Sequence, residues 1–195
     1  MRVLALLGSP RKGGNTEVLA DEFLRGAADA GADCDKVYLD DFRIRPLGLV
    51  GDLPGKRVDT RAGDDFLKVF KRFMAADVIC YVSPVYVQGM TAQMKCFVDR
   101  FSAYKWRSRY RAQIAAKGYA VITAFGGDSE GRWVIAPIKA AIGNANGKYL
   151  GDLGAQVYKK GDAKKNPKVL KAAYALGARA VRTMKTKVRA PRPRG

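Results

Sequence analysis

A polar segment near the start of the chain, from Ser9 to Thr16, has the residue types of an anion-binding loop. It follows an apolar run, Val3 to Leu7, and a helical pattern of apolar residues begins directly after it. A helix start leaves backbone N–H groups unpaired and carries a partial positive charge, so a loop that opens onto it can hold a phosphate. The segment adds side-chain donors, which are the Ser9 and Thr16 hydroxyls, the Asn15 amide and the Arg11 and Lys12 cations.

Two familiar phosphate-binding motifs do not fit this segment. A nucleotide P-loop would need Gly-Lys-Ser/Thr where the chain has Gly13-Gly14-Asn15, so its lysine and its magnesium-binding hydroxyl are missing. A dinucleotide fingerprint needs a glycine at the position of Pro10, which lacks an N–H group. Two interpretations remain: a compact pocket for a single phosphate, as on a mononucleotide, or an ordinary glycine-rich turn.

The composition excludes several kinds of chemistry. The chain has no histidine, so a Ser-His or Cys-His hydrolase lacks its base, and a zinc site lacks its usual ligands. The three cysteines, Cys34, Cys80 and Cys96, are far apart and form no metal-binding spacing. Cys80 lies in an apolar run and is predicted to be a buried core residue. We therefore predict no metal site and no catalytic side chain.

The length and charge of the chain indicate one globular domain with a basic end. Its 195 residues are 48% hydrophobic and carry a net charge of +18. From Lys159 onward there are thirteen Lys or Arg and one Asp, which indicates a solvated face or contact with a polyanion. We predict a domain over residues 1–188 and a disordered Pro/Arg tail over 189–195. Runs long enough for a membrane span or a signal peptide are absent, so a cytoplasmic location without membrane contact is expected.

Strand and helix patterns alternate along the chain. Apolar runs predict strands at Val3–Leu7, Cys34–Leu39, Asp77–Val82, Tyr119–Phe125 and Leu153–Tyr158. Helical periodicity follows each strand, except that a long loop is predicted over Arg43–Ala62 before the helix at Asp64–Ala75, and Thr91 is predicted to cap the next one. This alternation predicts an α/β fold, a doubly wound five-stranded parallel sheet with the flavodoxin-like order 2-1-3-4-5.

Such a sheet binds ligands beyond the carboxyl ends of its strands, between the first and the third. The loops there are Ser9 to Thr16 and Ser83 to Met90, with Gly126 to Gly131 beside them. We therefore expect these three loops to converge on one binding site.

Three segments resemble a known family. They are Gly8 to Thr16, Ser83 to Met90 and Ala92 to Arg100, and together they resemble the NADPH-dependent FMN reductase family and its iron-sulfur flavoprotein branch. The resemblance covers most of the chain up to about Phe125, in the same order and at similar spacing.

The resemblance implies bound FMN, with NADH or NADPH as hydride donor and a small electron acceptor such as flavin or quinone. It places the phosphate on the first loop, the ring edge along the second and the other side of the ring against the third. The residues assigned in this way are Ser9, Arg11, Lys12, Gly14, Asn15 and Thr16, then Pro84, Val85, Tyr86, Val87 and Gly89, then Ala124, Gly126, Gly127 and Asp128. Backbone N–H groups of the second and third loops are expected to face the ring. The family also implies a homodimer or homotetramer.

The sequence departs from the family at two places. The iron-sulfur branch has a cysteine cluster after the second strand, whereas Pro46 to Gly55 contains no cysteine, so a flavin-only protein is predicted. Relatives often carry an aromatic residue where this chain has Val87.

Two other functions stay open. An electron-transfer flavoprotein without substrate turnover fits the same fold, although the basic charge argues against it. A nucleic-acid-binding protein is favoured only by Tyr104 to Arg111, where cations alternate with aromatic residues, and by the basic C-terminal region.

Overall fold

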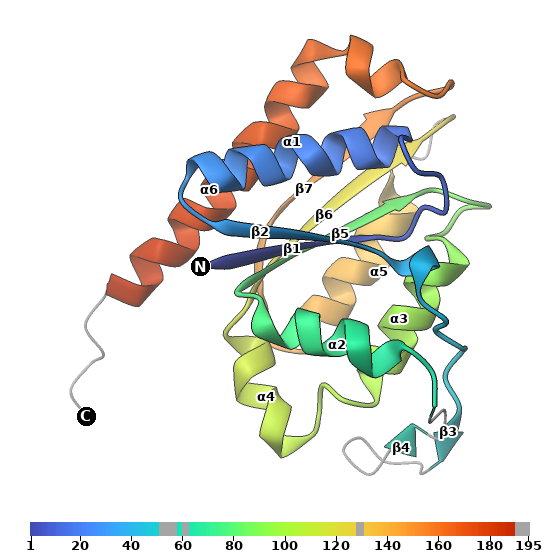
Figure 1. Ribbon diagram of the computed structural model, residues 1–195, viewed down its shortest axis with the longest axis vertical. Coiled ribbons are helices and arrows are strands. Elements are labelled where there is room, and N and C mark those ends of the chain that lie inside the picture. The colour runs from blue at the N-terminus through green and yellow to red at the C-terminus, as the bar shows by residue number, and fades with distance from the viewer. Residues whose placement is uncertain (51–57, 60–62, 128–130, 190–195) are drawn as a thin grey trace.

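The fold is built on a five-stranded parallel sheet (Figure 1). The computed structural model describes residues 1–50, 58–59, 63–127 and 131–189. The strands are β1 (Arg2–Leu7), β2 (Asp33–Tyr38), β5 (Val78–Pro84), β6 (Gly118–Phe125) and β7 (Lys148–Gln156). Their order is β2-β1-β5-β6-β7, with every neighbouring pair parallel. This confirms the predicted order 2-1-3-4-5.

Helices cover both faces of the sheet (Figure 1). One face is covered by α1 (Asn15–Asp29) and α6 (Pro167–Arg189), and the other by α2 (Phe66–Ala75), α3 (Ala92–Ser102), α4 (Ser108–Ala115) and α5 (Arg132–Gly143). Two short 3₁₀ helices, η1 (Leu39–Asp41) and η2 (Asp162–Lys165), follow β2 and β7. Within the described ranges, none of the helices has the length and apolarity needed to cross a membrane.

The central strands are buried on both faces. All eight residues of β6 and the first six of β5 are buried, which explains their continuous apolar runs. Cys80 is completely buried in β5, as predicted, and burial raises the pKa of its thiol. Thr91 caps α3 as predicted, because its side chain accepts a hydrogen bond from the Met94 N–H.

The structure differs from the predicted elements in four places. The basic stretch after α3 contains the short helix α4, and the predicted loop over 43–62 contains two-residue strands, β3 (Leu49–Val50) and β4 (Val58–Asp59). β7 begins at Lys148 rather than Leu153. Its pairing with β6 shifts register near Gly151, which has a φ of 129°, and this irregularity interrupts the alternating pattern from which a strand is predicted. α6 reaches Arg189, the first residue of the predicted tail, and residues 190–195 lie outside the described part.

A pair of glycines brings α1 and α6 into close contact. A Cβ on Gly177 would lie 1.9 Å from the carbonyl oxygen of Phe23, and a Cβ on Gly26 would lie 2.0 Å from that of Tyr174. Only glycine allows the two backbones to approach this closely. The second half of α1 is therefore held against the first half of α6.

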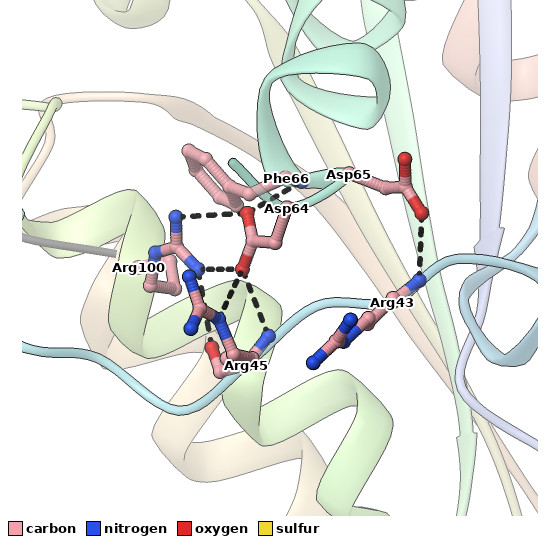
Figure 2. Close-up of polar contacts among 6 residues, drawn as sticks. All are labelled: Arg43, Arg45, Asp64, Asp65, Phe66 and Arg100. Carbon is pink, nitrogen blue, oxygen red and sulfur yellow. Dashed lines mark hydrogen bonds and ion pairs between the residues drawn. The ribbon is translucent and has the colours of Figure 1, made fainter. Parts of the chain in front are cut away.

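A buried ion pair joins α3 to the start of α2 (Figure 2). The Asp64 carboxylate accepts from the Arg100 guanidinium at 2.6 Å, and from the backbone N–H groups of Arg45 at 3.0 Å and Phe66 at 3.1 Å. Both charged side chains are almost completely buried, at 2% and 1% exposure. Burial alone would raise the pKa of Asp64, but Arg100 and the two N–H groups hold it below its usual value.

Candidate functional site

A cavity of about 280 Å³ lies at the carboxyl ends of the central strands. Four loops converge on it, those that follow β1, β5, β6 and β7, whereas the sequence predicted three. Its lining residues are Ser9, Arg11, Gly14, Asn15, Thr16, Pro84, Val85, Tyr86, Ala124, Phe125, Gly126, Val157, Tyr158, Lys159 and Lys160. Among these described residues three are cations and none is a carboxylate.

One half of the cavity is rich in hydrogen-bond donors. Ser9 and Thr16 are buried, at 5% and 3% exposure, yet both line the cavity. The Ser9 hydroxyl accepts from the Arg11 N–H at 3.1 Å, which leaves its own proton to be donated. The first intrahelical bond of α1 runs from Val18 to Gly14, so the N–H groups of residues 15–17 open the helix unpaired. These groups have the chemistry of a phosphate site.

Glu17 uses one donor of this loop and so limits the site. Its carboxylate accepts from the Gly13 N–H and the Tyr38 hydroxyl, and pairs with Lys36 at 3.1 Å. Partial burial would raise the pKa of Glu17, but these partners lower it, so the side chain is a bound anion. The Gly13 N–H is therefore not available to a ligand, which must accept hydrogen bonds from donors on either side of Gly13 instead.

The other half of the cavity is largely apolar. Pro84 ends β5 and Val85 follows it, and Ala124 and Phe125 end β6, so the pairing of these strands places their residues together. Tyr86 is 39% exposed at the mouth. Such a surface suits a flat ring more than a charged group.

Several backbone N–H groups that we expected to face the ring are engaged elsewhere. Val85 donates to the Ala124 carbonyl at 2.9 Å, and Tyr86 and Gly89 donate to each other's carbonyls at 2.9 and 3.0 Å. No acceptor lies against the N–H groups of Gly126 and Gly127 within the described residues. The expectation for the third loop therefore stays a prediction, while most of the second loop has no such donor left.

The second loop turns sharply at Val87 and Gln88. Their φ angles are 45° and 57°, in the left-handed region that favours glycine or asparagine. Val87 is fully exposed and does not line the cavity, and neither does Gly89. A β-branched residue in this conformation stores strain, and the exposed turn stands beside the mouth of the cavity.

Two other predicted residues are not brought into the cavity, and a third cannot be placed. The Lys12 ammonium pairs with Asp41 at 2.8 Å and lies over the Tyr38 ring, so it ties the first loop to η1. Gly127 is described, with a φ of 71°, but lies beyond the lining. Asp128 lies outside the described residues.

Asn15 lines the cavity, but its side chain is occupied. The amide donates to the Lys159 carbonyl at 2.8 Å and accepts from the N–H groups of Gly161 at 3.0 Å and Ala163 at 3.1 Å. Our expectation that this amide binds phosphate does not fit these contacts. The side chain instead fixes the loop after β7 against the start of α1.

The fourth wall was missed by sequence reasoning. It consists of Val157, Tyr158, Lys159 and Lys160, and Phe125 was missed beside it. One signal was present, because Lys159-Lys160 directly follows the predicted fifth strand. We read these lysines as the start of a basic face rather than as part of the site.

The basic and aromatic stretch over 104–111 lies at the opposite end of the sheet, where α4 leads into the start of β6. Two of its three aromatic rings have an arginine over one face: Arg107 lies over Tyr104 at 4.7 Å, and Arg109 lies over Tyr110 at 4.5 Å. Tyr104 is buried in the core. Nucleic-acid bases therefore find no open stacking surface on these two rings.

The thiols and carboxylates form no metal centre in the part of the chain that the structure describes. Cys34, Cys80 and Cys96 are free thiols. Burial raises the pKa of the partly exposed Cys34 and Cys96 as well, so neither is an activated thiolate.

Comparisons with known proteins agree with this geometry. A family model described as NADPH-dependent FMN reductase matches residues 1–156. The chain is 28% identical over 132 residues to YwqN of Bacillus subtilis, which is named as an NAD(P)H-dependent FMN-containing oxidoreductase; the match covers 66% of this chain and 68% of that protein. It is 29% identical over 170 residues to an iron-sulfur flavoprotein of Archaeoglobus fulgidus, covering 82% of this chain and 75% of the relative.

Solved structures share the fold. The Trp repressor binding protein from Bacillus subtilis superposes with a TM-score of 0.68 at 22% identity, over 89% of this chain and 96% of that one. An NAD(P)H:quinone oxidoreductase from Methanothermobacter marburgensis superposes with a TM-score of 0.62 at 16% identity, over 91% and 96%. At these identities the likeness concerns the fold alone.

Proposed function

The chain belongs to the NADPH-dependent FMN reductase family, and from this premise we propose that its cavity binds FMN and passes a hydride from NADH or NADPH to a small acceptor such as flavin or quinone. The chain is thus an NAD(P)H-dependent FMN oxidoreductase. The observation that carries the proposal is the division of one cavity into a donor-rich half and an apolar half.

The residues present fit FMN. Ser9, Thr16, Arg11 and the first N–H groups of α1 supply hydroxyl, cationic and backbone donors for a phosphate. The walls from Pro84 to Tyr86 and from Ala124 to Gly126 supply the apolar surface that a tricyclic ring needs. Gly14 lines the phosphate half of the cavity. A Cβ on Gly14 would lie 3.1 Å from the Arg11 carbonyl oxygen, so a glycine at this position lets the two ends of the loop lie close together.

The role of the lining residues is to bind FMN and to position it. When bound, FMN supplies a ring that accepts a hydride from nicotinamide and passes its electrons on. The described lining contains no carboxylate, thiol or imidazole that could serve as a general acid or base. Ser9 and Thr16 hold the phosphate end, and the apolar walls shield one part of the ring from water. Val85 and Ala124 are joined by a backbone hydrogen bond, which keeps those two walls at a fixed spacing.

The acceptor enters at the exposed mouth. Tyr86 and Tyr158 stand there, at 39% and 74% exposure, and both present aromatic surface. A flat aromatic acceptor gains stacking contact with such rings. This favours a quinone or a free flavin over an aliphatic acceptor.

Exposed apolar surface beside the mouth also supports the proposed homodimer or homotetramer, since Val87 and the two tyrosines leave apolar area uncovered. Sedimentation velocity at micromolar protein concentration is expected to show a dimer or a tetramer. A monomer across that range would reject this part of the proposal.

The function is tested by reconstitution. We expect the purified protein to bind FMN with quenching of flavin fluorescence, and the bound flavin absorption to bleach when NADH or NADPH is added without oxygen. Steady turnover of a quinone would establish the reductase, whereas bleaching without turnover would favour an electron-transfer flavoprotein. Failure to bind FMN would reject the proposal.

A further inference from the structure

The loop after β7 carries a cation to the phosphate half of the cavity. The Lys160 ammonium lies 3.9 Å from the position that a Cβ on Gly13 would take, so it reaches the loop after β1. Lys160 is exposed and lines the cavity, and no carboxylate pairs with it among the described residues. A cation without a carboxylate partner, placed beside a set of phosphate donors, is suited to bind the same phosphate through a charge-assisted hydrogen bond.

Hydrogen bonds of the loop after β7 fix the position of Lys160. The Asp162 carboxylate accepts from the N–H groups of Tyr158 at 3.0 Å and Lys159 at 2.7 Å, which closes the loop on itself. Asn15 then holds the closed loop from the other side through its three hydrogen bonds. The loop therefore sits against the start of α1 at a fixed distance.

The neighbouring acid does not compete for Lys160. Glu17, which accepts from the Gly13 N–H, is already paired with Lys36 and bonded to Tyr38. The other cation of this loop, Lys159, lies near Asp162: after the two backbone hydrogen bonds and the charge of Lys165, the charge of Lys159 helps to lower the pKa of that carboxyl. Of these two lysines, Lys160 is the one whose ammonium lies against Gly13 in the loop after β1.

This segment lies beyond the family match, which ends at residue 156. We propose that Lys160, positioned by Asn15, contacts the 5′-phosphate of bound FMN, so that the phosphate site is built from two segments 144 residues apart in the chain. The proposal rests on the proposed function, because it assigns a further binding residue to the same cavity. Asn15 is a positioning residue and acts through Lys160.

The test compares two flavins that differ only in the phosphate. Titration of the full-length protein is followed by quenching of flavin fluorescence, with FMN and with riboflavin. Lys160→Gln is expected to weaken FMN binding by about tenfold and to leave riboflavin binding unchanged, since riboflavin offers no phosphate. Lys164→Gln is the matched control: it removes the same charge from the same segment, outside the cavity lining, and is expected to change neither affinity.

Three results would overturn the proposal while the proposed function stands. One is unchanged FMN affinity in Lys160→Gln, and a second is an equal loss for both flavins. A raised KM for NADPH but not for NADH, with FMN affinity intact, would also overturn it, because the lysine would then serve the 2′-phosphate of the donor. If the unaltered protein binds neither flavin, the proposed function itself fails.

A double-mutant cycle tests the role of Asn15. If Asn15 acts through Lys160, the Lys160→Gln substitution costs about tenfold in FMN affinity in the parent and less than about twofold in an Asn15→Ala background. A purely structural role would lower thermal stability and weaken both flavins alike, and it would leave the Lys160→Gln effect at full size in both backgrounds.

Discussion

At the scale of single residues, Thr123 stands out because its buried hydroxyl has no hydrogen-bond partner within the described residues. The residue lies in β6, two positions before the end of the strand, and is completely buried. An unpaired buried hydroxyl costs free energy, because it gives up its bonds to water without replacement.

Thr123→Val is therefore expected to raise the free energy of unfolding by about 1 kcal/mol, since valine keeps the shape and removes the hydroxyl. Urea denaturation followed by circular dichroism measures the change. Thr91→Val is the control with the opposite sign: its hydroxyl donates to the Gly8 carbonyl at 2.8 Å and caps α3, so its loss is expected to cost about 1 to 2 kcal/mol. Destabilisation by Thr123→Val would show that its hydroxyl has a stabilising role.

Single residues also show why only part of the site could be predicted from the sequence. Ser9 and Thr16 could be assigned from the sequence, because a strand, a polar loop and a helix start define where their side chains lie. The contacts of Asn15 and Lys12 could not, since each depends on a residue far away in sequence, Lys159 and Asp41. Spacing along the chain carries no information about such partners.

At the scale of elements, the contact between α1 and α6 depends on two glycines. Gly177→Ala would place a methyl group 1.9 Å from the Phe23 carbonyl oxygen, so the helices must separate. We expect a loss of about 1 to 3 kcal/mol in the free energy of unfolding. Gly143→Ala, at the end of α5, is the matched control: its methyl would meet no atom within 4 Å, and the better helix propensity of alanine is expected to add about 0.5 to 1 kcal/mol.

A small effect of Gly177→Ala would mean that α6 shifts easily against α1. The loop after β7 would then move with it, and the distance from Lys160 to the first loop would not be fixed. Thermal melts of both variants, recorded side by side, separate these outcomes.

Most elements followed from periodicity, because buried parallel strands and amphipathic helices leave strong patterns. α4 did not, since Ile114 is the one buried residue of this short helix and no apolar periodicity marks it. The early part of β7 is half-buried and interrupted by Gly151, so its pattern is too weak to separate from a loop. Tertiary pairing with β6, rather than local preference, makes those residues a strand.

At the scale of the whole molecule, the ion pair of Asp64 and Arg100 ties α3 to the start of α2, two helices that cover the same face of the sheet (Figure 2). Removing one partner leaves a buried charge uncompensated. Asp64→Asn is therefore expected to cost about 3 to 5 kcal/mol at neutral pH. Asp33→Asn breaks an exposed pair with Arg2, at 3.7 Å, and is expected to change the stability by less than about 1 kcal/mol.

The pH dependence of stability follows from the direction of the Asp64 pKa. Its folded value lies below the unfolded value of about 3.9, so its contribution is complete above that pH. It is lost as the pH falls through the folded value, because the unfolded chain takes up the proton first. Urea midpoints between pH 2 and 7 are expected to fall more steeply at the acid end for the parent than for Asp64→Asn; parallel curves would show that another group governs acid unfolding.

The tie between Asn15 and Ala163 also sets when the site can be completed during translation. A ribosome makes the chain from the amino end at about 5 to 20 residues per second, so the first three walls emerge well before the fourth. Until Lys159 has left the exit tunnel, the Asn15 amide has none of its three partners, and it has all of them only after Ala163 has emerged. A nascent chain that has not yet extruded this segment therefore presents a site with three walls, and the fourth wall closes it only later.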